Sequence, residues 1–183
     1  MLFWRRWAAD RSISAKANAF VAAIAAEPAE ADVQWLAANG TSGDLDHARW
    51  ELRYARRALG LHTAQRDALD DRTASVVARS LSDYLARDPA VAAGKLRVVE
   101  RQLNERLRAY GEALASREGA GSGWHLGRAL LELAGRRDAA PAELVLHASE
   151  LLLGYLSAAN EALRESFGAA KLPEDVTPAA RRS

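Results

Sequence analysis

The chain has 183 residues, the size of one domain, and is long enough to bury a hydrophobic core without disulfides or metals. It contains no cysteine, which excludes disulfides, thiolate nucleophiles and cysteine-ligated zinc or iron–sulfur clusters. Its 25 Lys and Arg against 24 Asp and Glu leave a net charge of +1, which argues against a protein dedicated to binding nucleic acid through its charge.

The segment from Met1 to Trp7 combines three aromatic residues with two arginines, as helices that lie on membrane surfaces do. Lys16 and Asn18 interrupt the apolar run that a signal peptide needs. Nowhere does an apolar run reach the roughly 20 residues that cross a bilayer. We therefore expect a cytoplasmic protein without a transmembrane segment, whose first aromatic residues pack on the bundle. Reversible contact with a membrane surface is the alternative for this segment.

Two helices are predicted before residue 44. Ser12 or Ser14 can cap the first, whose apolar positions continue as far as Ile24. The second helix spans residues 29–38 and ends at the Asn-Gly pair that follows it.

Residues 44–88 contain no proline and one glycine, Gly60, and form the longest helical pattern in the chain. Apolar residues at a spacing of three and four place one face in the core, namely Leu45, Ala48, Leu52, Ala55 and Leu59. Trp50 and Tyr54 fall on nearly the opposite face. We predict one long helix, or two collinear helices, covered on both sides in the middle of a bundle or in an oligomer interface.

A return helix is predicted over residues 90–117, because Asp88 precedes a proline and leaves helical geometry. It most simply folds back antiparallel on the helix at 44–88. A glycine-rich linker at 119–123 then leads to a short helix at 124–134.

The last helix is predicted to be capped by Asp138 and to end near Gly168. The predicted fold is all-α: an antiparallel helical bundle organised on the long helix at 44–88 and its return helix at 90–117. We expect a single helical domain at 1–170 and a flexible C-terminal tail at 171–183.

Four arginines share one face of the long helix: Arg49, Arg53, Arg56 and Arg57, which we call the arginine row. Like charges four residues apart on a helix cost a few tenths of a kcal/mol each. We therefore expect groups outside this helix to compensate the arginine row.

The same face becomes acidic at Asp67 and Asp71. Arg53 and Asp67 lie equally far from Gly60 in the sequence, on opposite sides of it, and so do Arg49 and Asp71. The charge pattern of this face is therefore antisymmetric about Gly60. An antiparallel homodimer that crosses at Gly60 would form each pair twice. A helix that ends at Gly60 would form them once, within a hairpin of one chain. We favour a helix that continues through Gly60. The remaining alternative is that these charges form no such pairs and face water or unrelated helices.

Motifs for catalysis or metal binding are incomplete. His47 with Glu51 and His147 with Glu150 have helical spacing. In a di-iron bundle, however, the glutamate precedes the histidine and further glutamates complete the ligand set, and this chain shows the reverse order without a second copy of the motif. The aspartates at 67–71 resemble a magnesium motif only in composition, and the glycines at 119–127 lack the strand and lysine of a phosphate loop. We predict no metal, no cofactor and no catalytic residues.

The first functional hypothesis is a non-enzymatic helical interaction protein, an adaptor, chaperone or scaffold. Its partner would be another protein or a second copy in an antiparallel homodimer. The predicted binding residues are Arg49, Trp50, Arg53, Tyr54, Arg56, Arg57, Asp67 and Asp71. One alternative is a helical-bundle enzyme or a ligand or metal carrier near His47, Arg49 and Glu51. Another is nucleic-acid binding by the arginine row.

Overall fold

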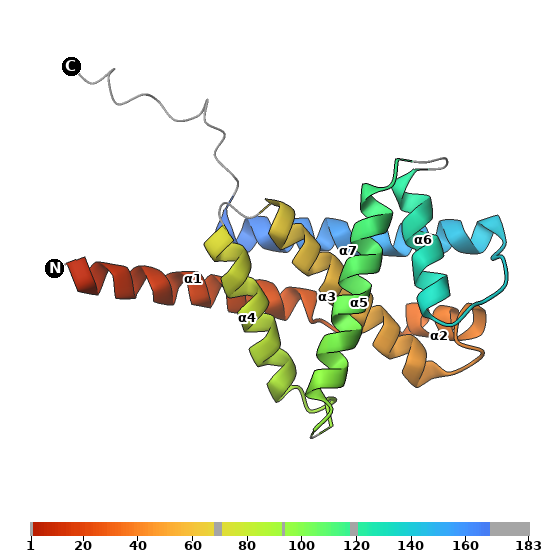
Figure 1. The fold of residues 1–183 in the computed structure, drawn as a ribbon, viewed down its shortest axis with the longest axis horizontal. Coiled ribbons are helices and arrows are strands. Elements are labelled where there is room, and N and C mark those ends of the chain that lie inside the picture. Colours follow the sequence, from red (N-terminus) through yellow and green to blue (C-terminus); the bar gives the residue numbers. More distant parts are fainter. Residues whose placement is uncertain (1, 68–70, 93, 118–120, 169–183) are drawn as a thin grey trace, which may run out of the picture.

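The computed structural model describes residues 2–67, 71–92, 94–117 and 121–168, with the backbone alone for residues 2–11. These residues form seven helices and no strand, which confirms the all-α fold (Figure 1). The helices are α1 (Leu2–Ile24), α2 (Glu30–Asn39), α3 (Leu45–Asp67), α4 (Asp71–Arg87), α5 (Leu96–Ala115), α6 (Ser122–Leu133) and α7 (Ala142–Phe167). The predicted tail at 171–183 lies outside the described residues.

Helix α3 is the centre of the bundle and contacts each of the other six helices that the structure describes (Figure 1). Its buried side chains point in all directions around its axis, including Leu52 and Leu59 on one side and Tyr54 and Leu61 on the other. The prediction that this segment is covered on both sides is confirmed, and the bundle itself provides the cover.

The prediction of one long helix, or of two collinear ones, over residues 44–88 is wrong. Helix α3 ends at Asp67, and α4 begins at Asp71 and runs in a different direction (Figure 1). The physical reason is that α4 has its own apolar face, with Val77, Leu81 and Leu85 buried, and packs it mainly on α1. The acidic residue in its first turn suits the positive end of the helix dipole.

The return helix begins at Leu96 instead of residue 90. The Asp88 carboxylate accepts a hydrogen bond from the Ala90 backbone nitrogen at 2.9 Å, which stabilises a turn where the prediction placed helix. Helix α5 runs antiparallel to α4, but the two diverge from this turn and α5 packs mainly on α3 and α6 (Figure 1).

Helix α1 begins at Leu2, so the predicted cap at Ser12 or Ser14 is wrong. The preceding alanines and arginines are good helix formers and allow the helix to continue through both serines. The part of α1 near Ile24 lies beside α4 and antiparallel to α7, whereas its other end projects beyond the remaining helices (Figure 1). Among the side chains of α1 that the structure describes, Ala17 is the first that is fully covered, and Ser12, Ser14 and Lys16 are exposed.

Helices α6 and α7 cross closely at Gly127. A Cβ atom added there would lie 2.2 Å from the Val145 carbonyl oxygen and 2.9 Å from the Ser149 backbone nitrogen. Asp138 does not cap α7, because the helix begins at Ala142 with Pro141 at the N-cap position. The Asp138 carboxylate pairs with Arg136 at 2.9 Å. As predicted, α7 ends near Gly168, which follows Phe167 as the C-cap and whose φ of 86° suits glycine.

Candidate functional site

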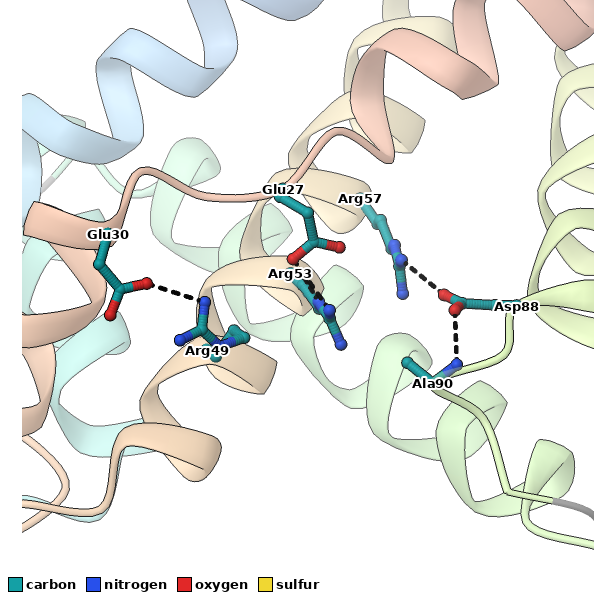
Figure 2. Close-up of polar contacts among 7 residues, drawn as sticks. All are labelled: Glu27, Glu30, Arg49, Arg53, Arg57, Asp88 and Ala90. Carbon is teal, nitrogen blue, oxygen red and sulfur yellow. Dashed lines mark hydrogen bonds and ion pairs between the residues drawn. The ribbon is translucent and has the colours of Figure 1, made fainter.

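The arginine row holds neighbouring segments of the same chain against α3 (Figure 2). Arg49 donates from Nη1 to Glu30 Oε2 at 3.0 Å, at the start of α2. Arg53 donates from Nε and Nη2 to Glu27 Oε2 at 3.0 and 2.9 Å, in the connection between α1 and α2. Both acids come from outside α3, which confirms that groups elsewhere compensate this row.

Arg57 is the most buried member of the arginine row, with 1% of the residue exposed. Its Nη2 donates to Asp88 Oδ2 at 3.1 Å, and its guanidinium lies over the ring of Tyr84, 5.7 Å from the centroid. Because Asp88 also accepts from Ala90, one carboxylate fixes the turn before α5 and ties it to α3 (Figure 2).

Arg56 completes the arginine row with contacts to the first and last helices. Its Nη2 donates to the Ala23 carbonyl oxygen at 3.2 Å, and its guanidinium lies 5.4 Å from the centroid of the Tyr155 ring. Burial raises the pKa of the Tyr155 hydroxyl, and the negative charge of Asp32 adds to this effect.

The acidic residues that were predicted to form ion pairs with the arginine row lie elsewhere. Asp67 pairs with its neighbour Arg66 at 2.6 Å, and that hydrogen bond lowers the pKa of the Asp67 carboxyl. Asp71 is exposed in the first turn of α4. The structure therefore brings neither of them to Arg49 or Arg53.

Gly60 packs inside the chain. A Cβ atom there would lie 2.6 Å from Ile24 Cγ2 and 2.9 Å from Ile24 Cβ, so α1 occupies this side of α3. A second chain cannot cross α3 at Gly60 without displacing α1. The preference for a continuous helix at this residue is confirmed, because α3 continues through it to Asp67, and the alternative of a turn there is wrong.

Trp50 and Tyr54 belong to the packed interior of the bundle. Their ring centroids are 5.5 Å apart, and Arg53 lies over Trp50 while Arg106 of α5 lies over Tyr54. Burial raises the pKa of the Tyr54 hydroxyl, with Arg106 acting in the opposite direction. The second face of α3 is thus an interface with α5 within the chain.

A buried ion pair between α3 and α5 was missed by the sequence reasoning. Arg106 donates from Nη2 to Glu51 Oε2 at 2.7 Å and from Nε to Glu51 Oε1 at 3.1 Å, and only 1% of Glu51 is exposed. Sequence could have suggested Glu51, since it adjoins Leu52 and Ala55 on the buried side of α3. The partner, 55 positions away, could not be found from helical spacing.

The hydroxyl of Tyr110 lies near this ion pair, fully buried, and has no hydrogen-bond partner among the described residues. Burial raises its pKa well above the ordinary value, and the negative charge of Glu51 raises it further. The hydroxyl therefore stays protonated and neutral in this interface.

The histidine and acid pairs do not assemble into a ligand set. His47 is exposed, whereas Glu51 faces α5 and Arg49 faces α2, so the three residues diverge. His147 stacks on Trp35 with ring centroids 4.3 Å apart. Within the part of the chain that the structure describes, no three His, Asp or Glu side chains are placed to share a metal ion.

A hollow of about 420 Å³ lies between the end of α6 and the start of α7. Trp124, Leu131 and Val145 contribute apolar surface to it, and Arg128 and Arg136 contribute charge. Both arginines are paired with acids that also line the hollow, Glu132 and Asp138. Two of the three arginines that line the hollow are therefore engaged by acids within the chain, whereas the buried Nε of Arg136 has no hydrogen-bond partner among the described residues.

No family model, curated protein or solved structure was found to match this chain. Among the described helices, none combines the length and the apolar character required for a membrane span.

Proposed function

We propose that this chain is a non-enzymatic helical interaction protein, of the adaptor or scaffold type, and that it docks through the outer segment of α1, residues 2–12. The observation that carries the proposal is the projection of this segment beyond the rest of the bundle (Figure 1). Short helices are marginal in water and gain most of their stability from packing against other elements. A partner that covers the outer segment would provide this packing.

The pairing of the arginine row supports a docking surface away from α3. Arg49 and Arg53 are engaged by Glu30 and Glu27, and Arg57 is buried against Asp88. Nucleic acid or another anionic partner would have to displace these acids first. No observation favours an enzyme or a carrier at His47, Arg49 and Glu51, because those side chains point to different neighbours.

Photo-cross-linking tests this proposal in the producing cell. A photoreactive phenylalanine analogue replaces Trp7 in the outer segment, which keeps an aromatic side chain there. The matched control places the same analogue at Ser157, an exposed position of α7 in the bundle. We expect defined adducts, with protein or lipid, from position 7 and none from position 157. Equal labelling at both positions, or none at position 7, would show that the outer segment has no partner.

A further inference from the structure

The hollow between α6 and α7 lies at the end of the bundle opposite the outer segment of α1 (Figure 1). Its volume of about 420 Å³ falls within the range of sites that enclose a small molecule. Leu131 and Val145, each with 1% of the residue exposed, form its apolar floor. Trp124 adds a partly buried aromatic ring. The hollow therefore offers apolar surface to a ligand with a flat, hydrophobic body.

The charged lining of the hollow contains more arginines than acids. Arg128 is paired with Glu132 and Arg136 with Asp138, at 2.9 Å in both cases. The third arginine of the lining, Arg137, is exposed and has no hydrogen-bond or ion-pair partner among the described residues. One positive charge of the lining is therefore left without a counter-charge.

The Arg136 guanidinium is held in place from two sides. Its Nη1 donates to the Asn39 carbonyl oxygen at 2.9 Å, and its Nη2 donates to Asp138 Oδ2 at 2.9 Å. The Nε of the same group is buried without a hydrogen-bond partner among the described residues. A buried donor that lacks an acceptor is costly. Two arginines of the lining, Arg136 and Arg137, thus have hydrogen-bond donors that the chain leaves unused.

This charge pattern discriminates between classes of ligand. A cation would meet an excess of arginine in the lining. A phosphate monoester carries nearly two negative charges near neutral pH, and Glu132 and Asp138 would repel the charge that the one unpaired arginine does not balance. A carboxylate carries a single negative charge, and its two oxygens fit the planar fork of a guanidinium. The lining therefore favours a monocarboxylate.

We propose that the hollow binds a small aromatic carboxylate, whose ring packs on Trp124 and the apolar floor and whose carboxylate accepts hydrogen bonds from Arg137. A free organic acid and the carboxyl-terminal residue of a peptide share this chemistry. The site is separate from the outer segment of α1, so binding here does not depend on the docking role proposed for that segment.

Isothermal titration calorimetry of the full chain with phenylbutyrate tests the proposal. The matched probe is phenylbutanol, which has nearly the same shape without the charge. We expect the acid to bind at least about tenfold more tightly than the alcohol, because hydrogen bonds to charged groups are strong. A short peptide that ends in phenylalanine, compared with its carboxyl-terminal amide, distinguishes the two sources. Tighter binding of this peptide than of phenylbutyrate would assign the site to a protein terminus, and the reverse would assign it to a free acid.

Substitutions in the lining give the second measurement. Arg137→Gln should weaken phenylbutyrate binding roughly 10- to 100-fold, because the charged hydrogen-bond donor is lost. Arg137→Lys keeps the charge but not the fork and should weaken binding less. The matched control is Arg97→Gln, which removes an exposed arginine of α5 and should leave the affinity unchanged. Circular dichroism verifies that each variant is folded.

NMR spectra of the amide and indole N–H groups locate the bound probe. The chain has five tryptophans, and Trp124→Leu identifies the Trp124 indole signal by its absence. We expect phenylbutyrate to shift this signal in the unaltered chain. Four results would each overturn the proposal: no binding of any probe, equal affinity for the acid and the alcohol, full affinity in Arg137→Gln, or shifts confined to the other tryptophans.

Discussion

Glu51 and Arg106 form a bidentate ion pair in the interface between α3 and α5, and both side chains are almost completely buried. Burying two charges costs several kcal/mol each, which a good pair geometry approximately offsets. Such a pair contributes little net stability, but it strongly disfavours arrangements of α5 that separate the two groups. We infer that it fixes the position of α5 along α3.

Removing one member of this pair should be far more harmful than removing both. Arg106→Met leaves the Glu51 charge buried and alone, so we expect the free energy of unfolding to fall by about 3–5 kcal/mol. Glu51→Leu combined with Arg106→Met should recover most of that loss. Urea unfolding followed by circular dichroism measures both. As a control, Arg108→Met breaks an exposed pair with Glu112 and should change stability by less than about 1 kcal/mol. Equal effects of Arg106→Met and Arg108→Met would contradict the burial of the Glu51 pair.

His62 makes stability depend on pH. Burial lowers the pKa of its imidazole from the ordinary 6.5, and Arg66 lowers it further, while Asp67 opposes both. The unfolded chain therefore binds more protons than the folded chain once the pH falls below about 6.5, and stability decreases in that range.

We expect Tm to fall between about pH 7 and pH 5.5, where carboxylates remain ionised. His62→Gln should reduce this fall, and the exposed control His47→Gln should leave it unchanged. Thermal unfolding at several pH values is the measurement. An identical fall in the His62 variant would mean that other groups cause it.

At the scale of elements, the crossing of α6 and α7 depends on the absence of a side chain at Gly127. The atoms nearest to an added Cβ are backbone atoms of Val145 and Ser149, which cannot move aside as a flexible side chain would. Gly127→Ala should therefore separate the two helices and lower the free energy of unfolding by about 1–3 kcal/mol or more.

Gly154 of α7 is the matched control, because nothing lies within 4 Å of a Cβ added there. Gly154→Ala should raise stability by about 0.5–1 kcal/mol, since alanine loses less backbone entropy in a helix. Denaturant titration of both variants should give opposite signs. A stabilising Gly127→Ala substitution would show that the helices cross less closely.

Helical periodicity identified the elements well but not where one helix passes into the next. The apolar pattern weakens after Gly60 and recovers at Val76 and Val77, and this weakening coincides with the change from α3 to α4. Helix propensity and the spacing of apolar residues do not reveal such a change of direction, because each helix is locally regular. The direction of α4 is decided by the availability of α1 as a surface on which α4 packs.

The same limit applied to the candidate interaction residues. The arginine row was identified correctly as a set that needs outside compensation, and its location on α3 is right. The acids that supply the compensation were assigned wrongly, because Glu27, Glu30 and Asp88 reach the row only through the tertiary fold. Antisymmetry about Gly60 had no structural meaning, since α1 already covers that glycine.

For the whole molecule, the bundle should be independent of the outer segment of α1. Deleting residues 2–11 removes helix that projects from the other elements and leaves the residues of α1 that the structure shows to be buried, from Ala17 to Ile24 (Figure 1). We expect Tm to stay nearly constant while the helical circular dichroism signal decreases. A large drop in Tm would show that the outer segment packs on the bundle, as the sequence first suggested.

The position of α1 also sets a constraint on biosynthesis. Helix α1 packs between α4 and α7, and α7 follows the other described helices along the chain. Phe20, Val21 and Ile24 therefore have no complete surface to bury against until α7 has been synthesised. Contacts between distant segments form slowly and leave apolar surface open to aggregation in the meantime. A nascent chain stalled before α7 should accordingly depend on chaperones more than the finished protein does.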